Sequence, residues 1–479
     1  MTSHRAGARS LRAIDAGEAR ASDVAVHHRE PAAVPAALQA SVTVAELLRD
    51  PERVAEAAVR SLADAPGTLM LPGWQPASQL LGHAGIAMLY GRLAEEDPAW
   101  SAVAHAHLAA AARAATAAGP AGAGDLLIPA RRRAAHVGGY ARLLARAAEV
   151  HASYTAAHSA ALAERLKEHG PGLSYLDYDV IAGLTRHART LLSAAAHGHE
   201  ASSDVLSAAL GQLVALTEPV TVYGRSVPGW WCAPERYVVP RDRAQFPRGD
   251  FNVGPAHGVC GPLALLSVAR LAGHEVPGMD DAIRRITTWV LDKGRREDSG
   301  AERWPGRVAF EEETGAARST PGGRGRGQVG WCYGTAGVAW SLYLAGRALD
   351  DPAVRARASA AVLSVFRDGS ADDTGDDPGL CHGRAGLLHI GARMAAATRD
   401  PGLWRAVDAT AQKLASDLDT RTAFGYRQVV RDTSGVARFD APGLIDGAAG
   451  VALALHTYAD ARRGRNPGAD AWDSAFLMS

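Results

Sequence analysis

A pair of glycines three residues apart, placed where an apolar run begins, recurs along this 479-residue chain. Gly258 with Gly261 forms one clear copy, and Gly334 with Gly337 forms another. Counted from the first glycine, copies of varying fidelity stand at positions 82, 138, 183, 258, 334, 383 and 447, and the copy at 138 is worn. A repeat roughly every 50 residues without strand-like alternation predicts a series of helical hairpins.

The glycines also constrain how such hairpins pack. Glycine inside a helix costs about 0.5–1 kcal/mol relative to alanine, so its repeated use indicates a recurring steric need. Converging inner helices of a closed ring would create that need, because bulkier side chains would clash there. We therefore expect an all-α fold, an α/α toroid of about seven helical hairpins with inner and outer helix rings. Segments 206–216 and 353–366 are expected outer helices, and an open solenoid is the alternative architecture.

The chain is expected to hold one folded domain. Residues 1–41 are rich in Ala, Arg, His and Ser without apolar periodicity, which predicts a disordered leader, or alternatively a basic tail that docks a partner. From Val42 onward apolar residues recur at helical spacing, so residues 42–479 are assigned to the toroid. Two long intervals contain insertions, at 219–255 and 294–329. Such loops are often substrate-binding lids, and plain surface insertions are the alternative.

Composition narrows the functional classes. Formal net charge is zero, which gives no sign of a nucleic-acid partner. We find no apolar run long enough to span a membrane and no secretion signal, so we expect a cytoplasmic protein. Four cysteines in so long a chain do not make a disulfide framework. Two of them open nearly identical loops, which favours metal binding in a reducing compartment.

Those loops contain Cys332 in one repeat and Cys381 with His382 in the next. If successive repeats stack, the two thiols and the imidazole are spatial neighbours, each just before a helix N-terminus that favours a thiolate. Two thiolates and one histidine are the ligands of a zinc site with one open position, and so soft a shell suits an incoming substrate thiolate. The alternative is two buried cysteines at helix starts. Cys260 is expected to be a packing residue, and Cys232 a spare thiol or, less favoured, a fourth ligand.

Three further residues are candidates for the chemistry around such a metal. His257 stands directly before Gly258, in the position that corresponds to the ligand loops, and a histidine can take and return a proton near neutral pH. Asp179 could orient that imidazole or take a proton, and Tyr333 could donate a hydrogen bond. The alternatives are a helix-cap histidine, an ordinary N-cap aspartate and a packing tyrosine.

Taken together, these motifs resemble the lanthionine synthetase C-like family, the cyclases of class I lanthipeptide biosynthesis. The resemblance covers roughly residues 60 to 460 and is carried by Tyr178-Asp179, Pro228-Gly229-Trp230-Trp231, Ala256-His257-Gly258, Gly261-Pro262-Leu263-Ala264-Leu265-Leu266, Trp331-Cys332-Tyr333-Gly334, Cys381-His382-Gly383 and the Gly-x-Ala-Gly repeats.

The resemblance implies a seven-fold α/α toroid with one Zn²⁺ per chain, held by Cys332, Cys381 and His382. It implies that cysteine thiolates of a dehydrated precursor peptide add to dehydroalanine or dehydrobutyrine made by a dehydratase partner. The products are lanthionine and methyllanthionine thioether rings. His257 would protonate the enolate, and Asp179 and Tyr333 match further active-site positions.

One position departs from the family pattern. An arginine is usual four residues before the first zinc cysteine, where this chain has Gln328. Arg324 or Arg326 in the glycine-rich stretch could supply the missing charge. Two other functions stay open: a related transferase that adds a small thiol such as glutathione to dehydroamino acids, and a non-catalytic zinc-stabilised scaffold for a dehydratase. An α/α-barrel glycosidase would need facing carboxylates, for which the repeat loops offer only Asp179 and Asp446.

Overall fold

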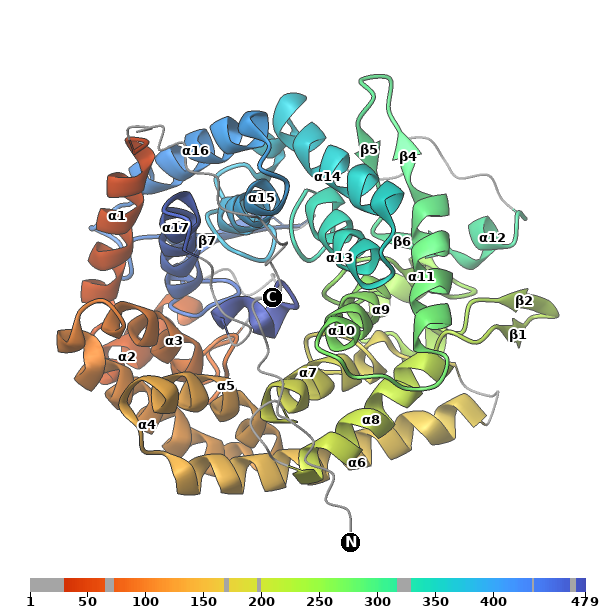
Figure 1. Ribbon diagram of the computed structural model, residues 1–479, viewed down its shortest axis with the longest axis horizontal. Helices are drawn as coiled ribbons and strands as arrows, with labels where there is room; N and C mark the ends of the chain where they lie inside the picture. The colour runs from red at the N-terminus through yellow and green to blue at the C-terminus, as the bar shows by residue number, and fades with distance from the viewer. Residues whose placement is uncertain are drawn as a thin grey trace, which may run out of the picture.

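The computed structural model describes residues 30–64, 73–167, 172–195, 200–316, 329–432, 435–465 and 471–479. Within these ranges the chain forms a closed double ring of helices (Figure 1). The inner ring consists of α3 (His83–Ala94), α5 (Pro120–Val137), α7 (Leu184–Ala195), α10 (Cys260–Leu271), α13 (Thr335–Ala348), α15 (Arg384–Thr398) and α17 (Ala448–Arg462). The outer ring consists of α4 (Ser101–Ala118), α6 (Ala141–Lys167), α8 (Glu200–Ala215), α11 (Met279–Lys293), α14 (Pro352–Arg367), α16 (Pro401–Ser416) and α1 (Ala33–Leu47).

Each inner helix packs against its two inner neighbours and against the outer helix of its own hairpin. The ring closes because α17 packs on α3, which lies at the other end of the chain. The expected toroid of seven hairpins is therefore confirmed, and the open solenoid is wrong. Segments 206–216 and 353–366 lie in the outer helices α8 and α14, as expected, apart from the one residue that follows α8.

The seventh hairpin joins the two ends of the chain. Its inner helix is α17, and its outer helix is α1, which packs against both α17 and α16. Helix α1 begins at Ala33, and Val34 and Ala37 are fully buried, so residues 33–41 belong to the ring. The predicted leader boundary at residue 41 is wrong there, because the short alanine-rich first turns of α1 carry too few large apolar residues to show periodicity. Residues 1–29 lie outside the described part of the chain.

The second repeat also differs from the expectation. Its inner helix, α5, begins at Pro120, and the worn glycine pair at 138 comes before the outer helix α6 instead. Gly138 and Gly139 both have positive φ, 73° and 80°, and form the tight turn between the two helices of this hairpin. The glycines at 138 therefore serve a turn, and they do not mark the start of an inner helix.

The structure gives a different reason for the glycine pairs from the one we expected. A Cβ on the second glycine would meet a carbonyl oxygen of its own loop, six residues earlier. The distances would be 2.0 Å for Gly337 to Trp331 O, 2.0 Å for Gly386 to Leu380 O, and 1.8 Å for Gly450 to Leu444 O. The loop folds back over the first turn of its own helix, and glycine leaves room for it. Contact between converging helices is not the main steric need.

These loops are joined to each other by backbone hydrogen bonds across one mouth of the ring. Residues two positions before the first glycine donate in turn: Ala256 N to Cys332 O (3.4 Å), Cys332 N to Cys381 O (3.0 Å), Cys381 N to Ile445 O (3.0 Å) and Ile445 N to Leu80 O (3.1 Å). Val180 N donates to Ala256 O and extends the series (3.0 Å). We call this series of hydrogen bonds the mouth belt. It fixes the order of the loops of α7, α10, α13, α15, α17 and α3 around the mouth.

The two predicted insertions carry short strands and pair with each other. The first holds β1 (Val220–Val222), β2 (Arg225–Val227), the short helix α9 (Pro240–Gln245) and β3 (Asp250–Asn252). The second holds β4 (Arg295–Arg296), β5 (Glu302–Arg303), β6 (Arg307–Ala309) and α12 (Phe310–Glu313), and β3 pairs antiparallel with β6. The Pro-rich and aromatic character of the first insertion favours a non-helical loop, and the short helix α9 departs from that expectation. Residues 317–328 of the second lie outside the described ranges.

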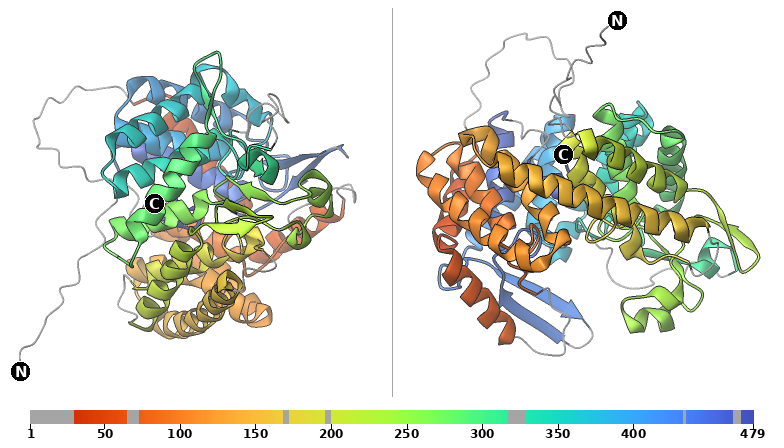
Figure 2. Two further views of the ribbon diagram at one scale, coloured as in Figure 1. Left: turned by 90° about the vertical axis from the view of Figure 1, so that its right-hand side faces the viewer. Right: turned by 90° about the horizontal axis from the view of Figure 1, so that it is seen from below.

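Two further segments complete the fold. Strands β7 (Arg427–Asp432) and β8 (Gly435–Asp440) form a hairpin that packs on α2 (Pro51–Ala63) and projects from the rings together with the insertions (Figure 2). The C-terminal segment 471–479 lies at the centre of the rings, where η5 (Trp472–Phe476) contacts α3 and α7. No helix in the described ranges is long and apolar enough to cross a membrane.

Candidate metal centre

The mouth belt brings the predicted metal ligands together. The Cys332 Sγ, the Cys381 Sγ and a ring nitrogen of His382 all lie within 4.8 Å of one another. Cys332 is buried, Cys381 is half-buried and the ring of His382 is 45% exposed, so the cluster opens to solvent on one side. Gly330 makes room for it, since a Cβ there would stand 2.7 Å from the His382 Cα.

A carboxylate that the sequence analysis did not name orients the histidine ligand. Asp377 Oδ2 lies 3.0 Å from His382 Nε2, and Asp377 Oδ1 accepts a hydrogen bond from Gly379 N (2.9 Å). Burial lowers the pKa of His382, but the hydrogen bond to Asp377 and the neighbouring Cys332 outweigh it and raise that pKa to about 12. Nε2 is the ring nitrogen of His382 that faces Asp377.

The thiols are suited to a metal as well. Hydrogen bonding from Cys381, with a further contribution from His382, lowers the pKa of Cys332 to about 5 against the opposing effect of burial. The pKa of Cys381 is raised, because it shares a proton with Cys332 and is itself desolvated. Two sulfurs, one imidazole and a carboxylate behind the imidazole match a tetrahedral zinc site with three protein ligands and an outer-sphere partner. The residues therefore fit Zn²⁺.

His257 and Asp179 form a hydrogen-bonded pair beside the cluster. His257 Nδ1 lies 2.6 Å from Asp179 Oδ2, and the ring is 30% exposed whereas the carboxylate is fully buried. Asp179 Oδ1 accepts hydrogen bonds from the backbone of Ile181, Ala182 and Gly183 at 3.1, 2.7 and 2.7 Å. Asp179 thus caps the loop before α7 and also holds the His257 ring in one orientation, with Nε2 left to exchange a proton.

Tyr333 lies between His257 and the thiols. Its ring centroid is 6.4 Å from that of His257, and its hydroxyl accepts a hydrogen bond from Asn252 Nδ2 (2.8 Å). Asn252 belongs to β3, so the pairing of the two insertions places it. Tyr175, in η2 (Tyr175–Asp177), covers the other side of His257 at a centroid distance of 4.9 Å. Burial raises the pKa of Tyr333 well above its ordinary value, so the hydroxyl keeps its proton.

The structure thus places all six predicted site residues at one mouth of the ring. Sequence reasoning missed Asp377 and Asn252 and gave Asp446 no role at the metal. Asp446 stands directly before Gly447, the same position that His382 has before Gly383, and this is the signal that could have found it. Burial raises the pKa of Asp446 to about 7, because the nearby His382 offsets only part of that cost.

Other expected contributors lie elsewhere. Cys232 and Cys260 are fully buried, and burial raises the pKa of both thiols, so neither belongs to the metal cluster. Tyr178 OH contacts Cys232 Sγ at 3.6 Å, which makes Cys232 a packing residue of the first insertion. Gln328, Arg324 and Arg326 lie outside the described residues.

A second group of possible ligands, Glu96, His456 and Asp460, has a different character. Arg92 Nη2 donates to both carboxylates, at 2.8 Å to Glu96 and 2.7 Å to Asp460, and Arg465 Nη1 lies 2.6 Å from Glu96. Two guanidinium groups already neutralise these carboxylates, so the cluster is an ion-pair network that ties α3 to α17.

Comparison with known proteins identifies the family. The family model described as "Lanthionine synthetase C-like protein" matches residues 73–477. The chain belongs to the lanthionine synthetase C-like family. Among solved structures, one described as "Nisin cyclase" has a fold similar to that of this chain, with a TM-score of 0.68. The match covers 91% of this chain and 98% of that chain, at 17% sequence identity. No curated protein matches the sequence. The structural match agrees with the toroid, and the resemblance seen in the motifs is confirmed.

Proposed function

We propose that this chain is a zinc-dependent cyclase that forms thioether rings in a dehydrated precursor peptide. The observation that carries the proposal is the meeting of two thiols and an imidazole within 4.8 Å of one another, at the same mouth as the His257–Asp179 pair. Cys332, Cys381 and His382 would hold one Zn²⁺ per chain. When bound, zinc would bind a substrate thiol, lower its pKa and keep it as a nucleophilic thiolate.

Protein side chains carry out the remaining steps, which are proton transfer and stabilisation of the developing charge. The substrate thiol releases its proton to solvent, from which the partly exposed His257 ring takes up a proton at Nε2. The thiolate sulfur then bonds to Cβ of dehydroalanine or dehydrobutyrine. The π electrons of that double bond move to give an enolate, and Cα must then gain a proton. His257 supplies it from Nε2, while Asp179 accepts the hydrogen bond from Nδ1–H and stabilises the charged ring. Tyr333, held by Asn252, donates its hydroxyl proton toward the developing negative oxygen.

This assignment implies two partners. The precursor must reach the enzyme already dehydrated, so a dehydratase has to act first. The same chemistry with a free small thiol would give a transferase instead. A peptide substrate is favoured because the metal cluster opens to solvent at His382, which is 45% exposed, and because Asn252 of the paired strands β3 and β6 lies at the site.

The test uses a synthetic peptide with one dehydroalanine and one cysteine, incubated with the zinc-loaded protein. The proposal predicts loss of the free thiol, measured by alkylation, without a change in peptide mass. Cys332→Ala should bind less zinc and lose this activity, whereas Cys260→Ala, a buried thiol away from the metal cluster, should retain both. His257→Asn should retain zinc and lose roughly 10²–10⁴-fold in rate. Equal thiol loss with wild type and Cys332→Ala would contradict the proposal, and a mass gain in the presence of glutathione alone would indicate the transferase.

A further inference from the structure

The mouth belt gives each loop of the site a neighbour on either side. In each loop one residue stands between the belt residue and the first glycine. In order around the mouth, these intervening residues are His257, Tyr333, His382, Asp446 and Leu81. The first is the proton donor of the proposed reaction, and His382 belongs to the metal cluster. Asp446 and Leu81 come next, on the side of the metal that is farther from His257.

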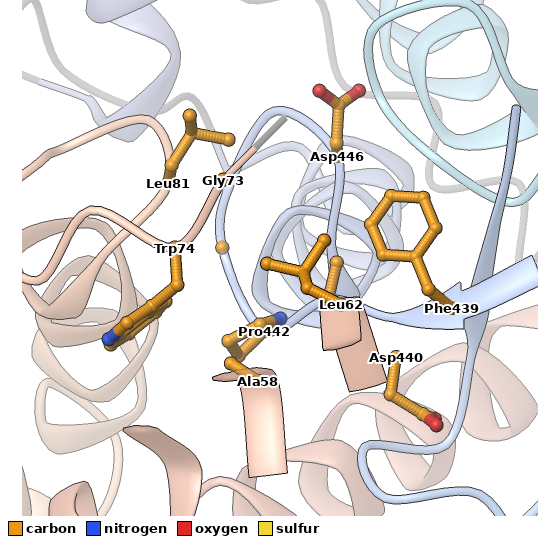
Figure 3. Close-up of a pocket in the computed structure, with 11 residues that line it drawn as sticks. Ala58, Leu62, Gly73, Trp74, Leu81, Phe439, Asp440, Pro442 and Asp446 are labelled. Atoms are coloured by element: carbon orange, nitrogen blue, oxygen red, sulfur yellow. The ribbon is translucent and has the colours of Figure 1, made fainter. Parts of the chain in front are cut away.

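A small apolar pocket opens at Asp446 and Leu81, between α2, the β8 strand and the loop before α17. Figure 3 shows the side chains around it, with Asp446 at one end and its carboxylate turned away from Trp74 and Pro442. The apolar residues that line it include Ala58, Leu62, Trp74, Leu81, Phe439 and Pro442.

The polar groups at this pocket differ in what they already bind. Asp440 is occupied, because its Oδ1 accepts a hydrogen bond from Ala423 N (3.0 Å) and its Oδ2 lies 3.5 Å from Arg427. Asp446 still has a free acceptor, because its Oδ1 is buried and has no hydrogen-bond partner in the described part of the chain. A buried carboxylate oxygen without a donor is costly, so a bound group that supplies an N–H would relieve that cost.

We propose that this pocket binds the side chain of the residue that follows the reacting cysteine in the precursor peptide, and that Asp446 accepts a hydrogen bond from a backbone N–H of the same stretch. This proposal rests on the proposed cyclase function. During ring closure the cysteine sulfur is at the metal and the dehydroamino acid is at His257, so the residues of the future ring span that side of the mouth. The chain beyond the cysteine then continues past His382 toward Asp446 and Leu81.

The pocket also limits which side chain it takes. Its walls are aliphatic and aromatic, and the cavity of about 20 Å³ has room for the end of one short aliphatic side chain. Valine or alanine fits this description. Aspartate would bring an unpaired charge beside Asp446, and tryptophan exceeds the space.

The experiment compares ring closure in peptides that differ at one position, with the zinc-loaded full chain. In the first series the residue after the cysteine is Val, Asp or Trp, and in the second the same three residues stand before the dehydroalanine. We expect kcat/KM to fall roughly 10- to 100-fold from Val to Asp and to Trp in the first series, and to change little in the second. Equal dependence in both series, or none in the first, would overturn the pocket assignment.

Substitutions in the pocket itself test the same inference with the peptide kept constant or compared between variants. Ala58→Phe fills the pocket from α2 and should abolish the preference for Val, with the zinc content unchanged. Val59→Phe is the matched control, because Val59 is 56% exposed on the same helix, and it should keep the preference. Asp446→Ala should raise KM for the Val peptide more than it lowers kcat. If Ala58→Phe keeps the full preference, or if Asp446→Ala leaves KM unchanged, the subsite is wrong, whereas failure of the wild type to cyclise every peptide would count against the cyclase function itself.

Discussion

At the scale of single residues, the site depends on side chains that orient other side chains. Asp377 holds His382, Asp179 holds His257, and Asn252 holds Tyr333. Each of the three orienting groups is buried, whereas His382 and His257 are partly exposed. A buried partner fixes a ring that solvent would otherwise leave free to rotate, so the geometry exists before substrate arrives.

Asp377 provides the sharpest test of this arrangement. Asp377→Asn should weaken zinc binding about 10- to 100-fold. A neutral amide accepts a weaker hydrogen bond from the imidazole N–H than a carboxylate does, so it fixes the ring less firmly and makes the ligand nitrogen less basic. Competition with a chromophoric chelator measures the affinity. Asp376→Asn is the control, since that neighbouring carboxylate pairs with Arg431 and Arg438 on the β7–β8 hairpin. Unchanged affinity in Asp377→Asn would show that His382 needs no orienting carboxylate.

At the scale of helices and loops, the glycines before and inside the inner helices decide the shape of the mouth. Helix α3 contains one glycine at which a side chain would clash and one at which it would not, so it allows a matched test. A Cβ on Gly85 would stand 2.2 Å from Gln79 O and 2.8 Å from Leu444 Cγ, whereas a Cβ on Gly91 would meet nothing within 4 Å.

Gly85→Ala should therefore lower the free energy of unfolding by about 1–3 kcal/mol through overpacking. Gly91→Ala in the same helix should raise it by roughly 0.5–1 kcal/mol, because alanine loses less backbone entropy on folding. Urea denaturation followed by circular dichroism gives both values. Equal effects of the two substitutions would mean that the loop carbonyl does not require glycine at position 85.

The C-terminal segment is a second element with a specific anchor. Asp473 is fully buried, and its Oδ2 lies 2.7 Å from His389 Nε2 and contacts Arg393. Burial opposes ionisation, but Arg393 and His389 outweigh it and hold the pKa of Asp473 well below its ordinary value. Trp331 Nε1 donates to Phe476 O (3.2 Å), so this segment also supports the residue next to Cys332.

A carboxylate with a lowered pKa stabilises the fold above its unfolded-state pKa of about 3.9 and loses that contribution as the pH falls further. Asp473→Asn should thus lower the free energy of unfolding at pH 7 by about 3 kcal/mol, because it leaves a buried cation with a neutral partner. The difference from wild type should shrink below about pH 4. Denaturation at both pH values measures it, with Asp281→Asn, 76% exposed, as a control expected to show little change. A difference that does not depend on pH would exclude this ionic anchor.

At the scale of the whole molecule, the ring is closed by its two ends. Helices α1 and α17, more than 400 positions apart in the sequence, form the seventh hairpin, so the last gap in the ring is filled by segments that meet only after folding. Because the mouth belt runs through the loop of α17, closure of the ring and assembly of the metal cluster are connected.

Ala37→Asp tests this closure. Ala37 is fully buried in α1, and an unpaired charge there should lower the free energy of unfolding by about 3 kcal/mol or more. Gln39→Asp introduces the same side chain on the exposed face of the same helix and should have little effect. Denaturation and zinc retention are measured for both. If the two variants were equally stable, residues 33–41 would not contribute to the ring.

Much of the architecture could be predicted from local sequence patterns, because most repeats share the same glycine-containing loop followed by an apolar helix. The copies at 258, 334, 383 and 447 each precede an inner helix, and the ligands beside them follow from their position in the repeat. The second repeat was misplaced, because the prediction put it at 138 and not at Gly119 and Gly122, where α5 begins. The start of α1 was missed because its first turns are rich in alanine. Asp377 and Asn252 were not predicted as site residues, because their roles depend on partners that only the folded chain brings close.

Repeat spacing and residue chemistry are properties of the chain, so they were enough to predict the helical hairpins, the family and the loops that hold Cys332, Cys381, His382 and His257. The tertiary structure decided which helices complete the ring, why the glycines are needed, and which buried carboxylates stand behind the exposed rings. The physical reason is that burial, hydrogen-bond partners and the order of loops around the mouth arise from contacts between residues far apart in the sequence. No local pattern encodes those contacts.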